Sequence, residues 1–125
     1  MTPIVNANFG ITNNGIFYTG YMDIHTVRKV PFTQLIGGVI WLVRNGQSYV
    51  DQSIILEEMS TQTSGNGTRF VNLKASRIGI GHDDQGRLMI ISIDGLGSAE
   101  RGSNLHELSQ IMIKYGAINA INLGK

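Results

Sequence analysis

Residues 117–123 read AINAINL, and this stretch is typical of a buried strand. The segment before it, from about Asn104 to Tyr115, carries the one strong helical pattern of the chain. Apolar side chains recur there at helical spacing and are expected to pack on a sheet: Leu105, Leu108, Met112 and Tyr115. The chain therefore ends in a helix that leads into a buried strand.

The boundaries of this helix also have sequence signals. Ser103 or Asn104 can cap its start, and Glu107 follows Asn104 at the spacing of a capping box. Lys114 suits the negative end of the helix dipole, and Gly116 can adopt the left-handed conformation that stops a helix.

The remainder of the chain has mainly strand and turn signals. Hairpins are predicted across residues 12–15 (TNNG), 45–46 (NG) and 83–86 (DDQG), because Asn, Asp and Gly favour tight turns. Apolar runs at 39–43 and 88–93 suggest strands covered on both faces, the second in a central position. Residues 23–29 suggest a short helix, and the polar segment 60–68 suggests an exposed loop.

These elements predict an α+β fold in a single domain, residues 1–125. We expect a hairpin-rich mixed or antiparallel sheet with one main helix, about 104–115, packed on it. The 42% hydrophobic and 15% charged residues are those of a folded chain.

Composition excludes several classes of function. With a formal net charge of +1 and scattered basic residues, the sequence predicts no clustered basic surface of the kind that binds nucleic acid. The chain has no cysteine, no pair of histidines at metal-binding spacing and no dinucleotide fingerprint, so we expect no metal and no other cofactor. No apolar run is long enough to cross a bilayer, and Met1-Thr2-Pro3-Ile4 does not resemble a signal peptide.

Three acidic or imidazole side chains are candidates for acid–base chemistry. His82 and Asp83 stand at the end of one strand, but the following residues also form a turn, in which Asp is favoured for its backbone hydrogen bonds. Asp94 follows the apolar strand 88–93, where either a turn or a site can be built.

Two arginines are candidates for binding an anion. Arg77 opens an apolar strand, where a guanidinium must be paired, either in a structural ion pair or with phosphate oxygens. Arg101 precedes Asn104 and the start of the long helix, which makes a second plausible anion site. Asn66-Gly67-Thr68 is a glycosylation sequon, a short pattern that often arises by chance.

A series of motifs resembles the phosphodiester glycosidase family over nearly the whole chain in one register. They are Asn8-Phe9-Gly10, Thr19-Gly20-Tyr21, Pro31-Phe32-x-Gln34-Leu35, residues 38–46 (GVIWLVRNG), Phe70-Val71-Asn72, Ala75-x-Arg77, Gly81-His82-Asp83, Arg101-Gly102-x-Asn104-Leu105 and residues 119–123 (NAINL). This family removes N-acetylglucosamine from phosphodiesters and exposes mannose 6-phosphate on lysosomal enzymes in the Golgi.

The resemblance implies roles for single residues. Arg77, Arg101 and Asn104 would bind the phosphate and the sugar, while His82, Asp83 and Asp94 would act in catalysis. The sequon at Asn66 and the family together imply the secretory pathway and phosphorylated glycans of glycoproteins as the substrate class.

Two departures from the family pattern qualify this expectation. The family's Asn-Gly-Gly-Phe-Phe segment has no counterpart before Asn8, and Gly124-Lys125 stands where its glycine-rich catalytic turn follows Leu123. Since glycoside cleavage ordinarily needs two carboxylic groups, we expect a truncated domain or one inactive alone. The alternative is a non-catalytic module for glycan or protein binding, or for assembly through an unpaired sheet edge at 119–123.

Overall fold

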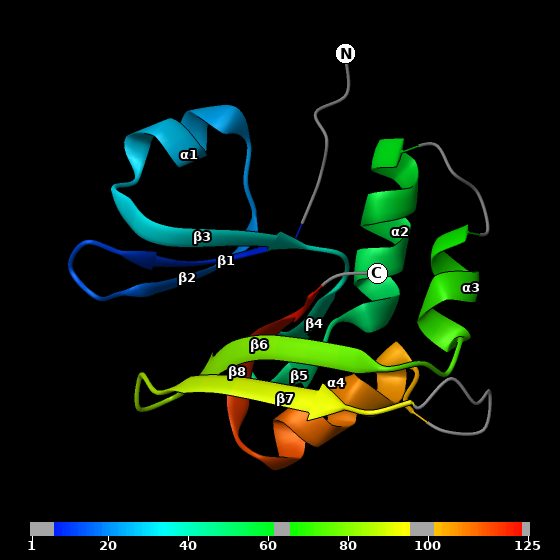
Figure 1. Cartoon of the computed structure of the whole chain (residues 1–125). Helices are drawn as coiled ribbons and strands as arrows, with labels where there is room; N and C mark the ends of the chain where they lie inside the picture. The colour runs from blue at the N-terminus through cyan, green and yellow to red at the C-terminus, as the bar shows by residue number, and fades with distance from the viewer. Residues whose placement is uncertain (1–6, 62–65, 96–101, 124–125) are drawn as a thin grey trace.

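The protein folds into two antiparallel sheets and four helices within the residues described, as a computed structural model shows (Figure 1). The structure describes residues 7–61, 66–95 and 102–123, and the side chains of 24, 58–61 and 66–68 are not described. The predicted α+β class is confirmed.

The smaller sheet has the strand order β2-β1-β3. β1 (Ala7–Thr12) and β2 (Phe17–Tyr21) form the predicted hairpin, and β3 (Phe32–Gly38) pairs with the other edge of β1. Between β2 and β3 lies α1 (Ile24–Lys29), whose N-cap Asp23 accepts a hydrogen bond from the Thr26 N–H. The short helix expected at 23–29 is therefore confirmed.

The larger sheet has the order β5-β4-β8-β6-β7. Its strands are β4 (Trp41–Arg44), β5 (Gln47–Ser48), β6 (Arg77–Asp83), β7 (Leu88–Ile93) and β8 (Ala117–Leu123). β8 is the buried strand predicted from AINAINL. It pairs on one side with β4 and on the other with β6, so the unpaired edge expected at 119–123 is wrong.

The helix expected at 104–115 is α4 (Leu105–Lys114), with Asn104 as its N-cap and a complete capping box with Glu107. Two helices were not predicted: α2 (Val50–Thr61) and α3 (Asn66–Asn72). They replace both ends of the loop expected at 60–68, and its middle, 62–65, lies outside the described residues. The predicted helix is thus joined by two others beside the larger sheet (Figure 1).

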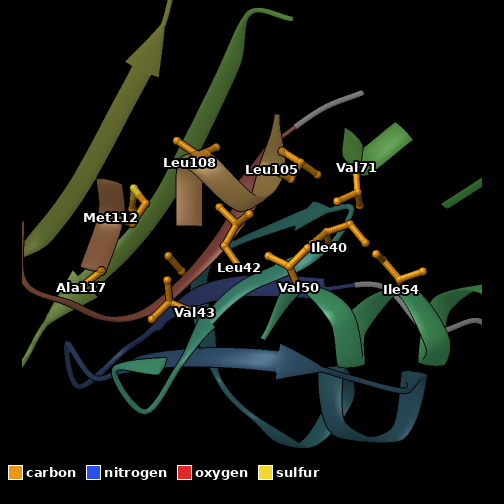
Figure 2. Close-up of a cluster of buried hydrophobic side chains, with 11 residues drawn as sticks. Ile40, Leu42, Val43, Val50, Ile54, Val71, Leu105, Leu108, Met112 and Ala117 are labelled. Atoms are coloured by element: carbon orange, nitrogen blue, oxygen red, sulfur yellow. The ribbon is translucent and has the colours of Figure 1, made fainter. Parts of the chain in front are cut away.

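The main core lies between the larger sheet and its helices (Figure 2). α2, α4 and β4 each contribute side chains to this core, the fully buried ones being Leu42, Val43, Val50, Leu105, Leu108 and Met112. Tyr115, expected in this core, is 67% exposed, because the helix has ended before it. A second cluster, which includes Phe9, Trp41 and Ile121, joins the smaller sheet to the opposite face of β8.

β7 corrects another expectation. Its apolar run predicted a central strand, but β7 is an edge strand with Leu88 48% and Ile90 60% exposed. Its other face, with Met89, Ile91 and Ile93, packs against the main core. One face of β7 is therefore buried and the other is open.

The crossing from β3 to β4 requires a glycine at 38. A Cβ added at Gly38 would lie 2.2 Å from the carbonyl oxygen of Asn122 in β8, whereas one added at Gly37 would meet only the Asn8 side chain at 3.4 Å. We expect Gly38→Ala to lower the free energy of unfolding by about 2 kcal/mol, since the backbone must move. Urea denaturation checks this, and Gly37→Ala is the matched control. Equal stability of the two variants would contradict the expected contact.

Candidate functional site

Several elements end together at one end of the larger sheet, which we call the Arg77 end. Arg77 opens β6 opposite Ile93, the last residue of β7, and Ile78 pairs with Leu123, the last residue of β8. The loop before α4 is joined to the same place by the bridge between Ala75 and Ser103. Of the predicted site residues, Arg77, Asp94 and Asn104 are therefore gathered here, while Arg101 lies outside the described residues.

Arg77 is buried, with 3% of its surface exposed. Its Nε donates to the Ser103 carbonyl at 3.1 Å, and Nη2 donates to the carbonyls of Phe70 at 2.9 Å and Leu73 at 2.6 Å. The guanidinium also lies over the Phe70 ring, 4.7 Å from its centroid. Burial lowers the pKa of Arg77. These contacts tie the end of α3 to the loop before α4, which is structural pairing with carbonyls rather than with a carboxylate.

Asp94 and its neighbour Gly95 continue from β7 beside the start of β6. Asp94 is exposed, and the Gly95 N–H donates to Ser76 Oγ at 2.7 Å. A Cβ at Gly95 would lie 2.6 Å from the backbone nitrogen of Ser76, so only glycine permits this approach. The turn thus holds the exposed Asp94 carboxylate one residue beyond the strand, next to Ser76 and Arg77.

Asn104 acts as the N-cap of α4. Its Oδ1 accepts the Glu107 N–H at 2.8 Å, and the Glu107 carboxylate accepts the Asn104 N–H at 3.0 Å. We expect Asn104→Ala to lower the free energy of unfolding by about 1 kcal/mol, whereas Asn104→Ser should retain the cap. Thermal denaturation of both variants checks this. A serine variant as unstable as the alanine variant would contradict the capping role.

A buried polar network lies near the start of β4, at the same end of the sheet. The Glu57 Oε2 atom accepts the N–H of Ile40 at 2.9 Å and the hydroxyl of Ser53 at 2.7 Å. Ser53 Oγ accepts the N–H of Trp41 at 2.9 Å and also contacts the Tyr21 hydroxyl. Since the Ser53 proton goes to Glu57, Tyr21 is the donor in that contact.

Burial sets the titration of this network. Loss of solvent around its carboxyl raises the pKa of Glu57 to about 7, although the hydrogen bonds from Ser53 and Ile40 lower it. Burial likewise raises the pKa of Tyr21. A carboxyl group that can hold or release its proton near neutral pH is suited to acid–base chemistry or to responding to pH.

His82 and Asp83 lie at the opposite end of β6, about 16 and 20 Å along the strand from Arg77 at the usual rise per residue. The Asp83 carboxylate accepts the N–H groups of Gln85 and Arg87 and a hydrogen bond from Arg87 Nε. The backbone N–H of Arg87, first among these contacts, lowers the pKa of Asp83. Asp83 therefore organises the β6–β7 turn.

Both ring nitrogens of His82 also have partners. Asn119 Oδ1 accepts the Asn45 N–H at 3.3 Å, so its amide nitrogen donates to His82 Nε2, also at 3.3 Å. The proton of the neutral ring then sits on Nδ1, which donates to the Asp83 carbonyl at 2.9 Å. The ring stacks on Phe17 at 5.2 Å between centroids.

A shallow cavity of about 500 Å³ opens beside this second group. It lies between the β1–β2 and β6–β7 turns, and its lining includes Ile16, Phe17, His82 and Asp84. The structure thus separates the predicted site residues into two groups. His82 and Asp83 form one, and Arg77, Asp94 and Asn104 form the other.

Comparison with known proteins extends the likeness seen in the motifs. The sequence model of the family described as phosphodiester glycosidase matches residues 3–124. The chain belongs to the phosphodiester glycosidase family. Among its relatives, N-acetylglucosamine-1-phosphodiester alpha-N-acetylglucosaminidase from Bos taurus and from Homo sapiens are each 42% identical over 120 residues. These matches cover 94% of this chain and 23% of each relative, so the chain spans about a quarter of their length.

A solved member of the phosphodiester glycosidase family has the same architecture. The zebrafish N-acetylglucosamine-1-phosphodiester alpha-N-acetylglucosaminidase catalytic domain, auto-inhibited by its pro-peptide, superposes with a TM-score of 0.85 at 36% identity. The match covers 97% of this chain and 40% of that one. A hypothetical protein from Synechocystis, with a TM-score of 0.55 at 19% identity, shares the fold.

Glu57 and Ser53 were missed by the sequence reasoning. The only local signal is a carboxylate directly after the apolar run Ile54-Ile55-Leu56, inside a segment without helical periodicity. Asn66 lies at the start of α3 rather than in a loop, and its side chain is not described. Within the described part of the chain, no three metal-ligating side chains cluster, and no helix is long and apolar enough to cross a membrane.

Proposed function

We propose that this chain contributes to a hydrolase domain that removes N-acetylglucosamine from N-acetylglucosamine-1-phosphodiesters. The observation that carries the proposal is the likeness to enzymes named for this reaction, at 42% identity over 94% of the chain. We further propose phosphorylated glycans of glycoproteins as the substrate class, exposure of mannose 6-phosphate as the outcome, and the secretory pathway and Golgi as the location.

The Arg77 end of the larger sheet is the proposed site. Asp94 offers an exposed carboxylate there, and Asn104 lies at the adjacent start of α4, where the helix dipole favours an anion. Arg101, two residues before Ser103, is the proposed cation for the phosphodiester. Arg77 supports the site by fixing the Ser103 carbonyl. The catalytic roles of His82 and Asp83 stay predictions, and the contacts of both residues favour structural roles.

Release of N-acetylglucosamine from an N-acetylglucosamine-1-phosphodiester tests the proposal. In the complete hydrolase domain to which the chain contributes, we expect Asp94→Asn to lower turnover by about 100-fold or more, as removal of an acid–base or charge-stabilising group does. Asp84→Asn is the matched control, because Asp84 is an exposed carboxylate in the β6–β7 turn at the opposite end of the strand. Equal loss in both variants, or none in Asp94→Asn, would remove the role of Asp94.

A second candidate function is binding without catalysis. The open face of β7 favours it, because Leu88, Ile90 and Tyr115 expose large apolar side chains around a shallow cavity of about 490 Å³. Calorimetric titration with the diester separates the two functions. Binding without release of sugar would favour a glycan-binding module. Neither binding nor release would leave protein binding through β7 as the surviving candidate.

A further inference from the structure

The network around Glu57 holds a backbone conformation that would otherwise be strained. Ile40 has a φ of 74°, which a β-branched residue rarely adopts. Its N–H is held by the Glu57 carboxylate, and its carbonyl oxygen accepts the Asn122 N–H at 3.0 Å. Both sides of the strained residue are thus fixed by hydrogen bonds, as strain at a special backbone position requires.

This strained residue lies where the chain passes from one sheet to the other. Gly38 ends β3 in the smaller sheet, and Trp41 begins β4 in the larger one. The Val39 N–H donates to the Asn122 carbonyl at 3.1 Å, so residues 38–40 lie against the end of β8. We call residues 38–40 the β3–β4 junction. The position of this junction depends on the two α2 side chains that accept the N–H groups of Ile40 and Trp41, namely Glu57 and Ser53.

Among the described residues of this network, Glu57 is the side chain whose pKa lies near neutral pH. Tyr21 faces it from β2. Tyr49 and Arg44 contact the Trp41 ring and interact electrostatically with Tyr21. Ser53, on α2 itself, donates a hydrogen bond to Glu57. An ionised carboxylate accepts stronger hydrogen bonds than a neutral one, so the charge on Glu57 changes the hold on Ile40 and Ser53.

We propose that Glu57 is a positioning residue of the hydrolase site: its ionised carboxylate fixes the β3–β4 junction against the end of β8, and gain of a proton loosens that junction. This proposal rests on the proposed function only in placing the substrate beside the junction. The hydrogen-bonded arrangement itself does not depend on any activity.

Trp41 is the single tryptophan of the chain and reports directly on the junction. Its backbone N–H donates a hydrogen bond to Ser53 Oγ, and its ring packs edge-on against Tyr21 with 5.4 Å between centroids. We expect its fluorescence to follow one transition centred near pH 7 in the wild-type chain. Glu57→Gln should abolish the transition, because its neutral amide does not titrate and resembles the protonated carboxyl at every pH. Asp84→Asn, a change of an exposed carboxylate in the β6–β7 turn, should leave it intact.

A second variant keeps the test decisive if Glu57→Gln does not fold. Ser53→Ala removes a hydrogen bond that lowers the pKa of Glu57, so the fluorescence transition should move to higher pH. A wild-type chain without a transition near pH 7 would overturn the proposal. A transition that survives in Glu57→Gln, or that does not move in Ser53→Ala, would overturn it as well.

The pH profile of diester hydrolysis separates this proposal from the proposed function. We expect KM for the diester to rise several-fold below pH 7 in the wild type. In Glu57→Gln, KM should be independent of pH and stay at the raised value, because the amide is neutral, while kcat changes by less than about threefold. Turnover with an unchanged inflection in Glu57→Gln would refute the positioning role and leave the function standing. A Trp41 transition that depends on Glu57, in a chain without turnover, would refute the function and leave the junction mechanism standing.

Discussion

Replacing Arg77 by alanine is expected to lower the free energy of unfolding by about 4 kcal/mol. The substitution leaves three backbone carbonyls, those of Phe70, Leu73 and Ser103, without their charged donor. Each buried acceptor left unpaired costs roughly 1–3 kcal/mol. It also removes the packing of the guanidinium on Phe70. Urea denaturation followed by circular dichroism measures the loss.

Arg87→Ala is the matched control for this prediction. Arg87 is also paired, with Asp83, but its side chain is 72% exposed, so the loss should stay below about 1 kcal/mol. Similar stabilities for the two variants would contradict the structural role of Arg77. The result also bears on function, because an inactive Arg77→Ala chain cannot be taken as evidence of phosphate binding unless it is shown to be folded.

The titration of Glu57 is expected to lower the free energy of unfolding by about 3 kcal/mol as the pH rises from 4.5 to 8. The folded state raises the pKa of Glu57 from 4.5 to about 7, because burial disfavours its charge. Over that window the folded state binds more protons than the unfolded state, so the free energy of unfolding decreases with rising pH. The contribution is fully present below pH 4.5 and is lost as the pH passes through 7.

Urea denaturation of the wild type and of Glu57→Gln, from pH 4.5 to 8, measures this component as the difference between the two curves. Glutamine does not titrate, so the free energy of unfolding of the variant should increase relative to that of the wild type as the pH rises. Asp84→Asn should follow the wild type, because Asp84 is an exposed carboxylate in the β6–β7 turn. Parallel curves for wild type and Glu57→Gln would show that Glu57 titrates normally in the folded chain.

Local signals in the sequence were sufficient for the hairpins, α4 and β8. Asn45 and Gly46 both adopt positive φ, as the predicted turn requires, and the capping box of Asn104 and Glu107 forms as expected. In each case a few neighbouring residues set the local conformation. The buried character of AINAINL likewise identified β8 as an interior strand.

The features that local sequence signals did not predict, α2 and the edge position of β7, depend on long-range packing. α2 was missed because Ile55 and Leu56 are exposed beside buried Val50 and Ile54, so its apolar residues form no stripe. β7 was placed wrongly because its apolar residues lie on both faces, although only one face is covered.

The candidate site was only partly foreseeable for the same reason. Arg77, Asp94 and Asn104 are far apart in the sequence and meet because three strands and α4 begin or end together. His82 and Asp83 belong to the same strand as Arg77, but they lie at its other end. Glu57 becomes noteworthy only because α2 buries its carboxyl beneath Ile40 and Trp41, residues of another element.

The central place of β8 also constrains how the chain is made. β4 and β6 are synthesised well before β8, yet each pairs with it rather than with the other. While the chain is still emerging from the ribosome, both strands expose a backbone edge that only residues 117–123 can close. The larger sheet can therefore be completed only after β8 has been synthesised, and until then the edges of β4 and β6 are open to pairing with other chains.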